Sequence, residues 1–266
     1  MGVDAELYLL DIRAFLEDGA RGGLIEEALS RLDGERREKT RGIGQARGQA
    51  ASLGAGLLLQ LAVRRAESVK EAVRAGKSGA VQDTECAGQA EPGQDTESAR
   101  ETGVALTQWT VPGLLESLDA PLPFVYRYRE NGKPYLVNYP YYFNISHSGD
   151  YVVCALSERE VGVDLQIHRG ANIGRLAGRF FAPAEADALG RAADREAFFF
   201  RLWARKEAYG KLTGKGLADA IGKDLHSGGT GLGGMLCWEE YGGLPGYSMA
   251  VCQYAAGVHD PSGMAH

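Results

Sequence analysis

The sequence has few cysteines, and their spacing matches no common metal or redox site. Four cysteines are spread over 266 residues, at Cys86, Cys154, Cys237 and Cys252. No pair has the CxxC spacing typical of zinc and thiol redox sites. A cysteine-based metal centre is therefore excluded, and we expect buried or free thiols in a reducing cytoplasm.

An excess of positive charge is also missing. The chain carries 35 acidic and 29 basic residues, a net charge of −6. A general nucleic-acid binder draws its affinity from a basic face, so the sequence argues against nucleic acid as a partner. An anionic ligand would need a local basic cluster.

Long hydrophobic runs are absent as well. No segment reaches the ~18–20 apolar residues that a membrane-spanning helix needs. Residues 1–20 carry acids among their apolar residues and have no basic region followed by a hydrophobic core, which argues against a signal peptide. We therefore expect a cytoplasmic protein with no membrane partner.

The apolar spacing predicts alternating strands and helices. Strands are expected at about residues 5–13, 124–128, 151–156, 160–166, 238–240 and 247–253, and helices at 24–32, 45–65, 172–180, 183–191 and 194–213. Pro183 suits the first position of one helix, and Gly214 suits the end of another. This order predicts an α+β fold with two similar subdomains, residues 1–125 and 126–266.

The composition changes between about residues 67 and 107. Large apolar residues become rare there, and Gln-Asp-Thr-Glu occurs twice, at 82–85 and 94–97. Such a segment has little apolar surface to bury. We interpret it as a disordered insertion in the first subdomain.

Two pairs of polar residues offer chemistry in the second half. Asp164 and Gln166 are two apart on a predicted strand, so they share a face. Glu207 and Lys211 are four apart on a predicted helix, so they are neighbours. Each pair alone is also typical of an ordinary exposed surface. One or two carboxylates with substrate phosphates and water suffice for Mg²⁺, which makes Asp164 and Glu207 candidate metal ligands.

Nearby polar residues strengthen this interpretation. Ser146 and His147 lie in a segment expected to form a turn between apolar strands, and Lys133 lies in a Gly-Lys-Pro turn. Taken alone, His147 is also compatible with a histidine of the hydrophobic core, and Lys133 with an exposed residue of a turn. Together with the carboxylates they indicate a magnesium and diphosphate site.

These residues belong to a longer series of motifs that resembles Sfp-type 4′-phosphopantetheinyl transferases. The matching segments are 132–135 (GKPY), 143–148 (FNISHS), 161–164 (VGVD), 179–181 (RFF), 203–211 (WARKEAYGK) and 214–217 (GKGL), with weaker agreement at 36–39, 52–53 and 247–251. The motifs occur in order across most of the chain outside the insertion. Their combination is specific.

The resemblance implies two related α+β subdomains with coenzyme A and Mg²⁺ between them. The implied reaction moves the 4′-phosphopantetheine arm of coenzyme A onto a serine of an acyl, peptidyl or aryl carrier domain and releases adenosine 3′,5′-bisphosphate. Asp164 and Glu207 would hold Mg²⁺, with Gln166 at a third ligand position. Glu207 or a water it orients would accept the serine proton.

The resemblance also implies a set of phosphate contacts. Lys211 would stabilise charge on the diphosphate. The remaining contacts to coenzyme A would come from both halves: Arg36, Lys39, Ser52, Lys133, Ser146 and His147.

One departure concerns Gln166, since many members of the family have an acidic residue there. Two other functions therefore stay open: a carrier-binding module that has lost its chemistry, and a metal-dependent diphosphate hydrolase. Retention of Asp164, Glu207 and Lys211 argues against the first of these. The carrier and its pathway, polyketide, peptide, siderophore or fatty-acid synthesis, are not fixed by the sequence. A monomer is expected, because two fused subdomains can build the site within one chain.

Overall fold

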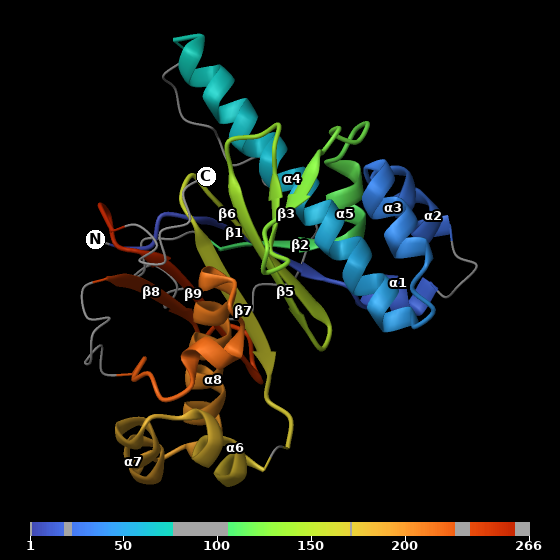
Figure 1. The fold of residues 1–266 in the computed structure, drawn as a ribbon. Coiled ribbons are helices and arrows are strands. Elements are labelled where there is room, and N and C mark those ends of the chain that lie inside the picture. The colour runs from blue at the N-terminus through green and yellow to red at the C-terminus, as the bar shows by residue number, and fades with distance from the viewer. Residues whose placement is uncertain (1, 19–22, 77–105, 171, 227–234, 259–266) are drawn as a thin grey trace.

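The computed structural model describes residues 2–18, 23–76, 106–170, 172–226 and 235–258. Two sheets form its centre (Figure 1). The first has the order β2-β1-β6-β5, built from β1 (Glu6–Asp11), β2 (Leu106–Thr110), β5 (Tyr142–Ser148) and β6 (Tyr151–Ser157). The second has the order β7-β9-β8, built from β7 (Val161–Ile167), β8 (Leu236–Tyr241) and β9 (Tyr247–Tyr254). A hairpin of β3 (Tyr126–Tyr128) and β4 (Pro134–Leu136) forms a third, two-stranded sheet.

Strand pairing within the first sheet joins distant parts of the chain. β1 pairs with β2 in parallel and with β6 antiparallel, and β5 pairs with β6 antiparallel. This sheet therefore takes strands from both sides of the expected boundary between residues 125 and 126. That boundary stays a prediction.

Helices cover the outer faces of the two sheets (Figure 1). Those beside the first sheet are α1 (Arg13–Asp18), α2 (Gly23–Ser30), α3 (Gly34–Arg41), α4 (Ala46–Arg74) and α5 (Val111–Glu116). Those beside the second are α6 (Ile173–Phe180), α7 (Pro183–Arg191), α8 (Arg195–Thr213) and the short 3-10 helix Leu217–Ala220. Asp194 caps α8 by accepting from the Ala197 amide at 2.9 Å. Gly214 ends this helix in the left-handed region with φ 69°, which glycine adopts without strain.

The hydrophobic core follows from the alternation of side chains along the strands. Tyr8 and Leu10 of β1 pack in a cluster with the helices of the first half, chiefly α4. Leu7 and Leu9, on the opposite face, pack with the apolar side chains of β7 and β9. The molecule is thus layered as helix, sheet, sheet and helix, because each sheet buries both faces. The predicted α+β fold class is confirmed.

The predicted elements are found with two corrections. The insertion was expected to begin near Glu67, but α4 continues as helix to Arg74. Residues 67–74 are therefore not disordered, whereas residues 77–105 lie outside the described residues. The expected Ser-His turn is also wrong, because Ser146 and His147 lie within strand β5.

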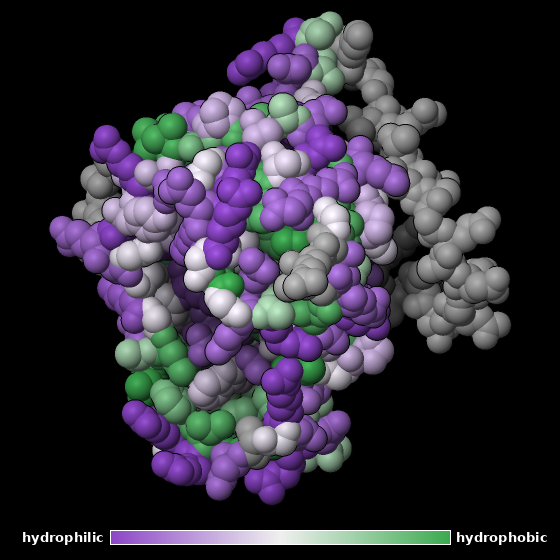
Figure 2. All heavy atoms as spheres, turned by 90° about the vertical axis from the view of Figure 1, so that its right-hand side faces the viewer, coloured by the Kyte–Doolittle hydropathy of each residue, from purple (hydrophilic) through white to green (hydrophobic). Residues whose placement is uncertain are grey.

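The helix-covered side of the first sheet has a mainly hydrophilic surface, and apolar side chains gather lower down, at the height of α6 and α7 (Figure 2). Within the described part of the chain, no helix combines the length and apolar character required to cross a membrane.

Candidate active site

A close contact between β7 and α8 sets the geometry of the carboxylate pair. A Cβ atom added to Gly162 would lie 2.1 Å from the Ala208 carbonyl oxygen and 2.6 Å from the Leu212 nitrogen. Only glycine fits at this separation. Because the helix backbone lies directly on the strand, Glu207 and Lys211 of α8 are held beside Asp164 of β7.

Asp164 is the centre of a buried polar network. The residue is 5% exposed. The Oδ1 atom accepts from the Lys211 ammonium at 2.7 Å and from the Ser146 hydroxyl at 2.8 Å. The Lys211 Nζ also lies 2.7 Å from Ser146 Oγ. The network joins β5, β7 and α8, so these three predicted site residues are brought together.

The second carboxylate oxygen of Asp164 has no such contact. Oδ2 is buried and has no hydrogen-bond partner among the described residues. A buried carboxylate oxygen without a donor carries a full desolvation cost. It is suited to a cation, because a cation satisfies an acceptor that no protein group contacts.

Glu207 is electrostatically coupled to Asp164. Desolvation raises the pKa of the Glu207 carboxyl above its ordinary value, the negative charge of Asp164 raises it further, and Lys211 opposes both. Two carboxylates that repel one another are stabilised by a shared cation.

The residues present fit a magnesium ion. Within the described residues, no group of three or more His, Cys, Asp and Glu side chains is arranged to hold a metal. Mg²⁺ does not need such a cage, because it binds through one or two carboxylates, with water and substrate phosphates completing its shell. Asp164 and Glu207 supply that number.

Gln166 lies on the same strand but takes no part in the network. It is partly buried, and its Nε2 donates to the Ile167 carbonyl at 3.2 Å. No hydrogen bond connects it with Asp164 or Glu207 in the described structure. Its assignment as a metal ligand stays a prediction.

A cavity of about 470 Å³, here called the α3–β5 cavity, contains most of the other predicted residues. Arg36 and Lys39 reach it from α3, Ser52 from α4 and His147 from β5. Ser52 is held by a 2.7 Å hydrogen bond with Thr40. Two cationic side chains, a hydroxyl and an imidazole therefore converge from the neighbouring helices α3 and α4 and from the distant strand β5.

His147 connects this cavity with the carboxylate site. Desolvation and the nearby Lys211 ammonium lower the pKa of the His147 imidazole, and Asp164 opposes the shift. His147 is thus predominantly neutral near pH 7 and can gain a proton when an anion binds.

Lys133 is placed differently from the other predicted phosphate contacts. Its Nζ lies 2.7 Å from Glu160 Oε2 and 3.1 Å from the Leu212 carbonyl oxygen, and its side chain is 9% exposed. Arg129 pairs with the same Glu160 carboxylate. Desolvation lowers the pKa of Lys133, although Glu160 opposes this. Lys133 fastens the β3–β4 hairpin to the end of α8 and does not line the α3–β5 cavity.

Several residues of the cavity were missed by the sequence analysis. They include Glu35, Tyr126, Tyr128 and Asn144. The Tyr128 hydroxyl donates to Glu35 at 2.8 Å. The tyrosines alternate along the predicted strand at 124–128, which was a usable signal for one shared face, but nothing local indicated that this face meets α3.

Lys206, next to Glu207, was also missed. It forms an ion pair with Glu185 of α7 at 2.8 Å, and both side chains are fully buried. Its ammonium also donates to the carbonyl oxygens of Ala220 and Lys223. These bonds tie α7 and the chain after α8 to the helix that carries Glu207.

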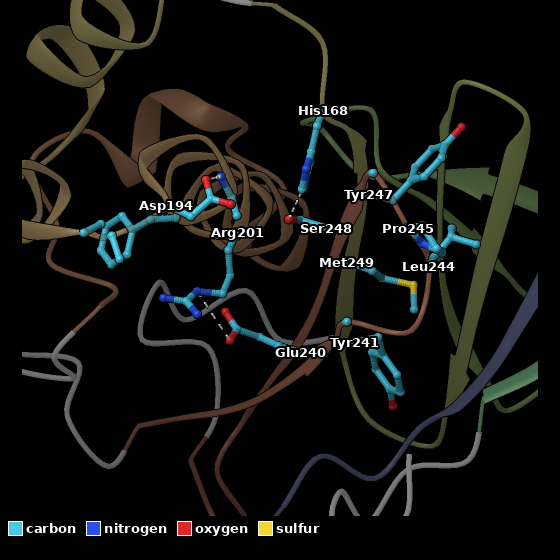
Figure 3. Close-up of a pocket in the computed structure, with 16 residues that line it drawn as sticks. His168, Asp194, Arg201, Glu240, Tyr241, Leu244, Pro245, Tyr247, Ser248 and Met249 are labelled. Atoms are coloured by element: carbon cyan, nitrogen blue, oxygen red, sulfur yellow. Dashed lines mark hydrogen bonds and ion pairs between the residues drawn. The ribbon is translucent and has the colours of Figure 1, made fainter. Parts of the chain in front are cut away.

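A second cavity, of about 680 Å³, lies at the other end of α8 (Figure 3). His168 bonds to Ser248 at 2.8 Å, and Arg201 lies 3.9 Å from Glu240. The lining contains none of the predicted site residues. The candidate site is therefore the carboxylate pair with the α3–β5 cavity.

Comparison with known proteins relates the segment that carries the carboxylate pair to one superfamily. Residues 160–230 match the model of the 4′-phosphopantetheinyl transferase superfamily. The resemblance to Sfp-type 4′-phosphopantetheinyl transferases is thus confirmed. The matched segment contains Asp164, Gln166, Glu207 and Lys211.

Individual curated proteins similar to this chain are also named 4′-phosphopantetheinyl transferases. The 4′-phosphopantetheinyl transferase psf-1 of Bacillus pumilus is 46% identical over 91 residues, 33% of this chain and 39% of the relative. Sfp of Bacillus subtilis is 35% identical over 136 residues, 47% of this chain and 60% of the relative. AcpT of Escherichia coli is 42% identical over 107 residues, 38% and 54% of the two chains. The aligned segments thus span between 39% and 60% of these relatives.

Proposed function

We propose that this protein is a 4′-phosphopantetheinyl transferase that uses coenzyme A and modifies a serine of an acyl or peptidyl carrier protein. One observation carries the proposal: a coupled pair of carboxylates, Asp164 and Glu207, lies beside a cavity lined by Arg36, Lys39 and His147. The names of the relatives support the same transfer.

The α3–β5 cavity suits the nucleotide end of coenzyme A. Arg36 and Lys39 would bind its phosphates, since charge-assisted hydrogen bonds to phosphate are among the stronger polar contacts in proteins. Ser52 and His147 would add donors. Tyr126 and Tyr128 offer ring surface against which a base can stack.

Asp164 and Glu207 would hold Mg²⁺ at the diphosphate. The ion supplies charge neutralisation of the diphosphate oxygens. The Lys211 ammonium forms an ion pair with Asp164 in this structure. It would also stabilise negative charge on the diphosphate oxygens.

The proposed reaction is an in-line displacement at the phosphorus next to pantetheine. The serine oxygen of the carrier forms the new P–O bond, and the bond to the bridging diphosphate oxygen breaks. Glu207, or a water it orients, would accept the serine proton. Adenosine 3′,5′-bisphosphate leaves. Positioning and electrostatics supply most of the rate.

A direct experiment separates this function from its alternatives. The protein is incubated with coenzyme A, MgCl₂ and a panel of apo carrier domains, and each carrier is weighed by mass spectrometry. A mass gain of one phosphopantetheine arm supports the transferase. Bisphosphate release without a carrier would indicate a diphosphate hydrolase, and carrier binding without either product would indicate a degenerate binding module.

The same experiment addresses the finer parts of the proposal. Repeating it with EDTA tests the magnesium requirement, and the carrier that reacts fastest names the partner class. We further propose that the protein acts in the cytoplasm as a monomer, since both halves of the site lie in one chain. Sedimentation of the purified protein tests the oligomeric state.

A further inference from the structure

The facing edges of the two sheets lie beside each other without joining into one sheet. β5 is the last strand of the first sheet and pairs only with β6, within the described strands. β7 is the first strand of the second sheet and pairs with β9. An edge strand carries backbone N–H groups that need acceptors when they are buried.

Three side chains of β5 supply those acceptors. The Val163 amide donates to Asn144 Oδ1 at 2.9 Å. The Leu165 amide donates to Ser146 Oγ at 3.2 Å, and the Ile167 amide donates to Ser148 Oγ at 3.0 Å. Alternate residues of one strand thus bind alternate residues of the other, in parallel register. We call these three residues, Asn144, Ser146 and Ser148, the side-chain ladder.

The ladder binds the backbone on both sides of Asp164. The amides on either side of it, those of Val163 and Leu165, are bound by Asn144 and Ser146. Ser146 also donates its one hydroxyl hydrogen to Asp164 Oδ1. The Ser146 Oγ atom in turn accepts from the Leu165 amide and from the Lys211 ammonium, so the hydrogen-bonding capacity of this hydroxyl is filled.

One end of the ladder, Asn144, lies at the α3–β5 cavity. Asn144 and His147 line the α3–β5 cavity, whereas Ser146 and Ser148 do not. Strand β5 therefore both lines the cavity and binds the amides of β7, and Asn144 does both.

We propose that Asn144, Ser146 and Ser148 are positioning residues that hold β7, and with it Asp164, at a set place relative to the α3–β5 cavity. Ser146 then serves the carboxylate and not the phosphates. Its role in transfer rests on the proposed function, but the ladder itself does not.

Hydrogen exchange followed by NMR tests the ladder without any activity. In the wild-type protein, the amides of Val163, Leu165 and Ile167 should all exchange slowly, as hydrogen-bonded edge amides do. Ser148→Ala should speed exchange at Ile167 about tenfold and affect Val163 least. Ser148→Thr, which keeps the hydroxyl, should restore protection. Ser30→Ala, at an exposed serine that bonds to the Glu27 carbonyl, is the matched control.

Kinetics then show whether the ladder positions Asp164. Ser148→Ala should lower kcat about fivefold and leave the KM for coenzyme A unchanged, because Ser148 touches neither the cavity nor the carboxylates. Rapid exchange of the three amides in the wild-type protein would overturn the proposal, even if Ser148→Ala does not fold. So would an unchanged Ile167 rate in a folded variant. Slow, ladder-dependent exchange in a protein that modifies no carrier would keep the ladder and reject the transferase.

Discussion

The two parts of the candidate site are built in opposite ways. The carboxylate site lies where β5, β7 and α8 meet, and Asp164 is 5% exposed there, in hydrogen bonds with Ser146 and Lys211. The α3–β5 cavity collects side chains from α3, α4, the β3–β4 hairpin and β5, and one of these side chains, that of Lys39, is exposed. Buried charges need fixed partners, whereas a phosphate-binding surface can remain open to water. Substitutions should therefore act on chemistry in the first part and on affinity in the second.

The largest expected effect is the loss of a carboxylate charge. Glu207→Gln or Asp164→Asn should abolish transfer, because each removes charge from the metal site and Glu207→Gln also removes the proposed base. The fold should remain, as measured by circular dichroism. Mass spectrometry of the carrier measures transfer, and Glu196→Gln, at an exposed acid of the same helix, is the control. Near-wild-type turnover at saturating Mg²⁺ would contradict the assignment.

Two lysines sharpen the comparison further. Lys133→Met should lower stability by about 2 kcal/mol, several degrees in Tm, because it removes one partner of a buried ion pair while Arg129 remains on Glu160. The KM for coenzyme A should stay unchanged. Lys39→Met should do the reverse, raising KM about fivefold at constant Tm.

Thermal unfolding and steady-state kinetics on both variants decide between the two roles. If Lys133→Met instead raises KM without a change in Tm, Lys133 leaves Glu160 to bind phosphate, as the family resemblance implies. Arg129→Met shares the Glu160 partner and serves as a matched comparison.

These lysines also show where the sequence was informative. Arg36, Lys39, Ser52 and His147 do converge on one cavity, as the motifs implied. The partner of Lys133 could not be foreseen, because Glu160 lies 27 positions away and looked like the start of an ordinary strand. Whether such a lysine binds a ligand or a protein carboxylate depends on contacts between distant elements, which local sequence does not reveal.

The strands and helices also divide into those that local sequence predicts and those that depend on contacts with distant elements. The strands β1, β6 and β7 could be predicted because they are apolar runs, which the structure buries on both faces. Helix α8 could be predicted because its length is apolar-rich and Gly214 marks its end. Strand β5 was mistaken for a turn because Asn144, Ser146 and Ser148 are turn-forming residues. Their hydroxyl and amide groups here satisfy a neighbouring strand. The end of helix α4 was predicted too early because the polar residues after Glu67 looked like a linker, although Lys70, Glu71 and Ala72 are good helix formers.

A smaller effect is expected for the protonation of His147. Desolvation and Lys211 hold its pKa below the ordinary value in the free protein. A bound phosphate should raise this pKa, because it adds negative charge beside the imidazole. The affinity for coenzyme A should therefore rise as the pH falls through the pKa of the bound state.

NMR titration of the His147 ring signals with and without coenzyme A measures both values. His168, which lies outside the α3–β5 cavity, gives an internal control. An unchanged His147 pKa in the complex would show that the imidazole does not contact the anion.

The smallest expected effect concerns Gln166, which separates the carboxylate site from the family pattern. Its amide donates to the neighbouring Ile167 carbonyl and contributes no charge to the pair formed by Asp164 and Glu207. Gln166→Glu should add a hard oxygen ligand on the face of β7 that carries Asp164. It should lower the Mg²⁺ concentration for half-maximal rate a few-fold. Gln166→Ala should change that midpoint little, because water can take the same coordination position.

Titration of Mg²⁺ against transfer rate, at fixed coenzyme A and carrier, compares the three proteins. The expected order of midpoints is Gln166→Glu below wild type, with Gln166→Ala close to wild type. If Gln166→Glu leaves the midpoint unchanged and Gln166→Ala is inactive, Gln166 is not a weak metal ligand. Its amide would then act by positioning substrate or Glu207, and the pair of carboxylates, Asp164 and Glu207, would account alone for the metal affinity of the site.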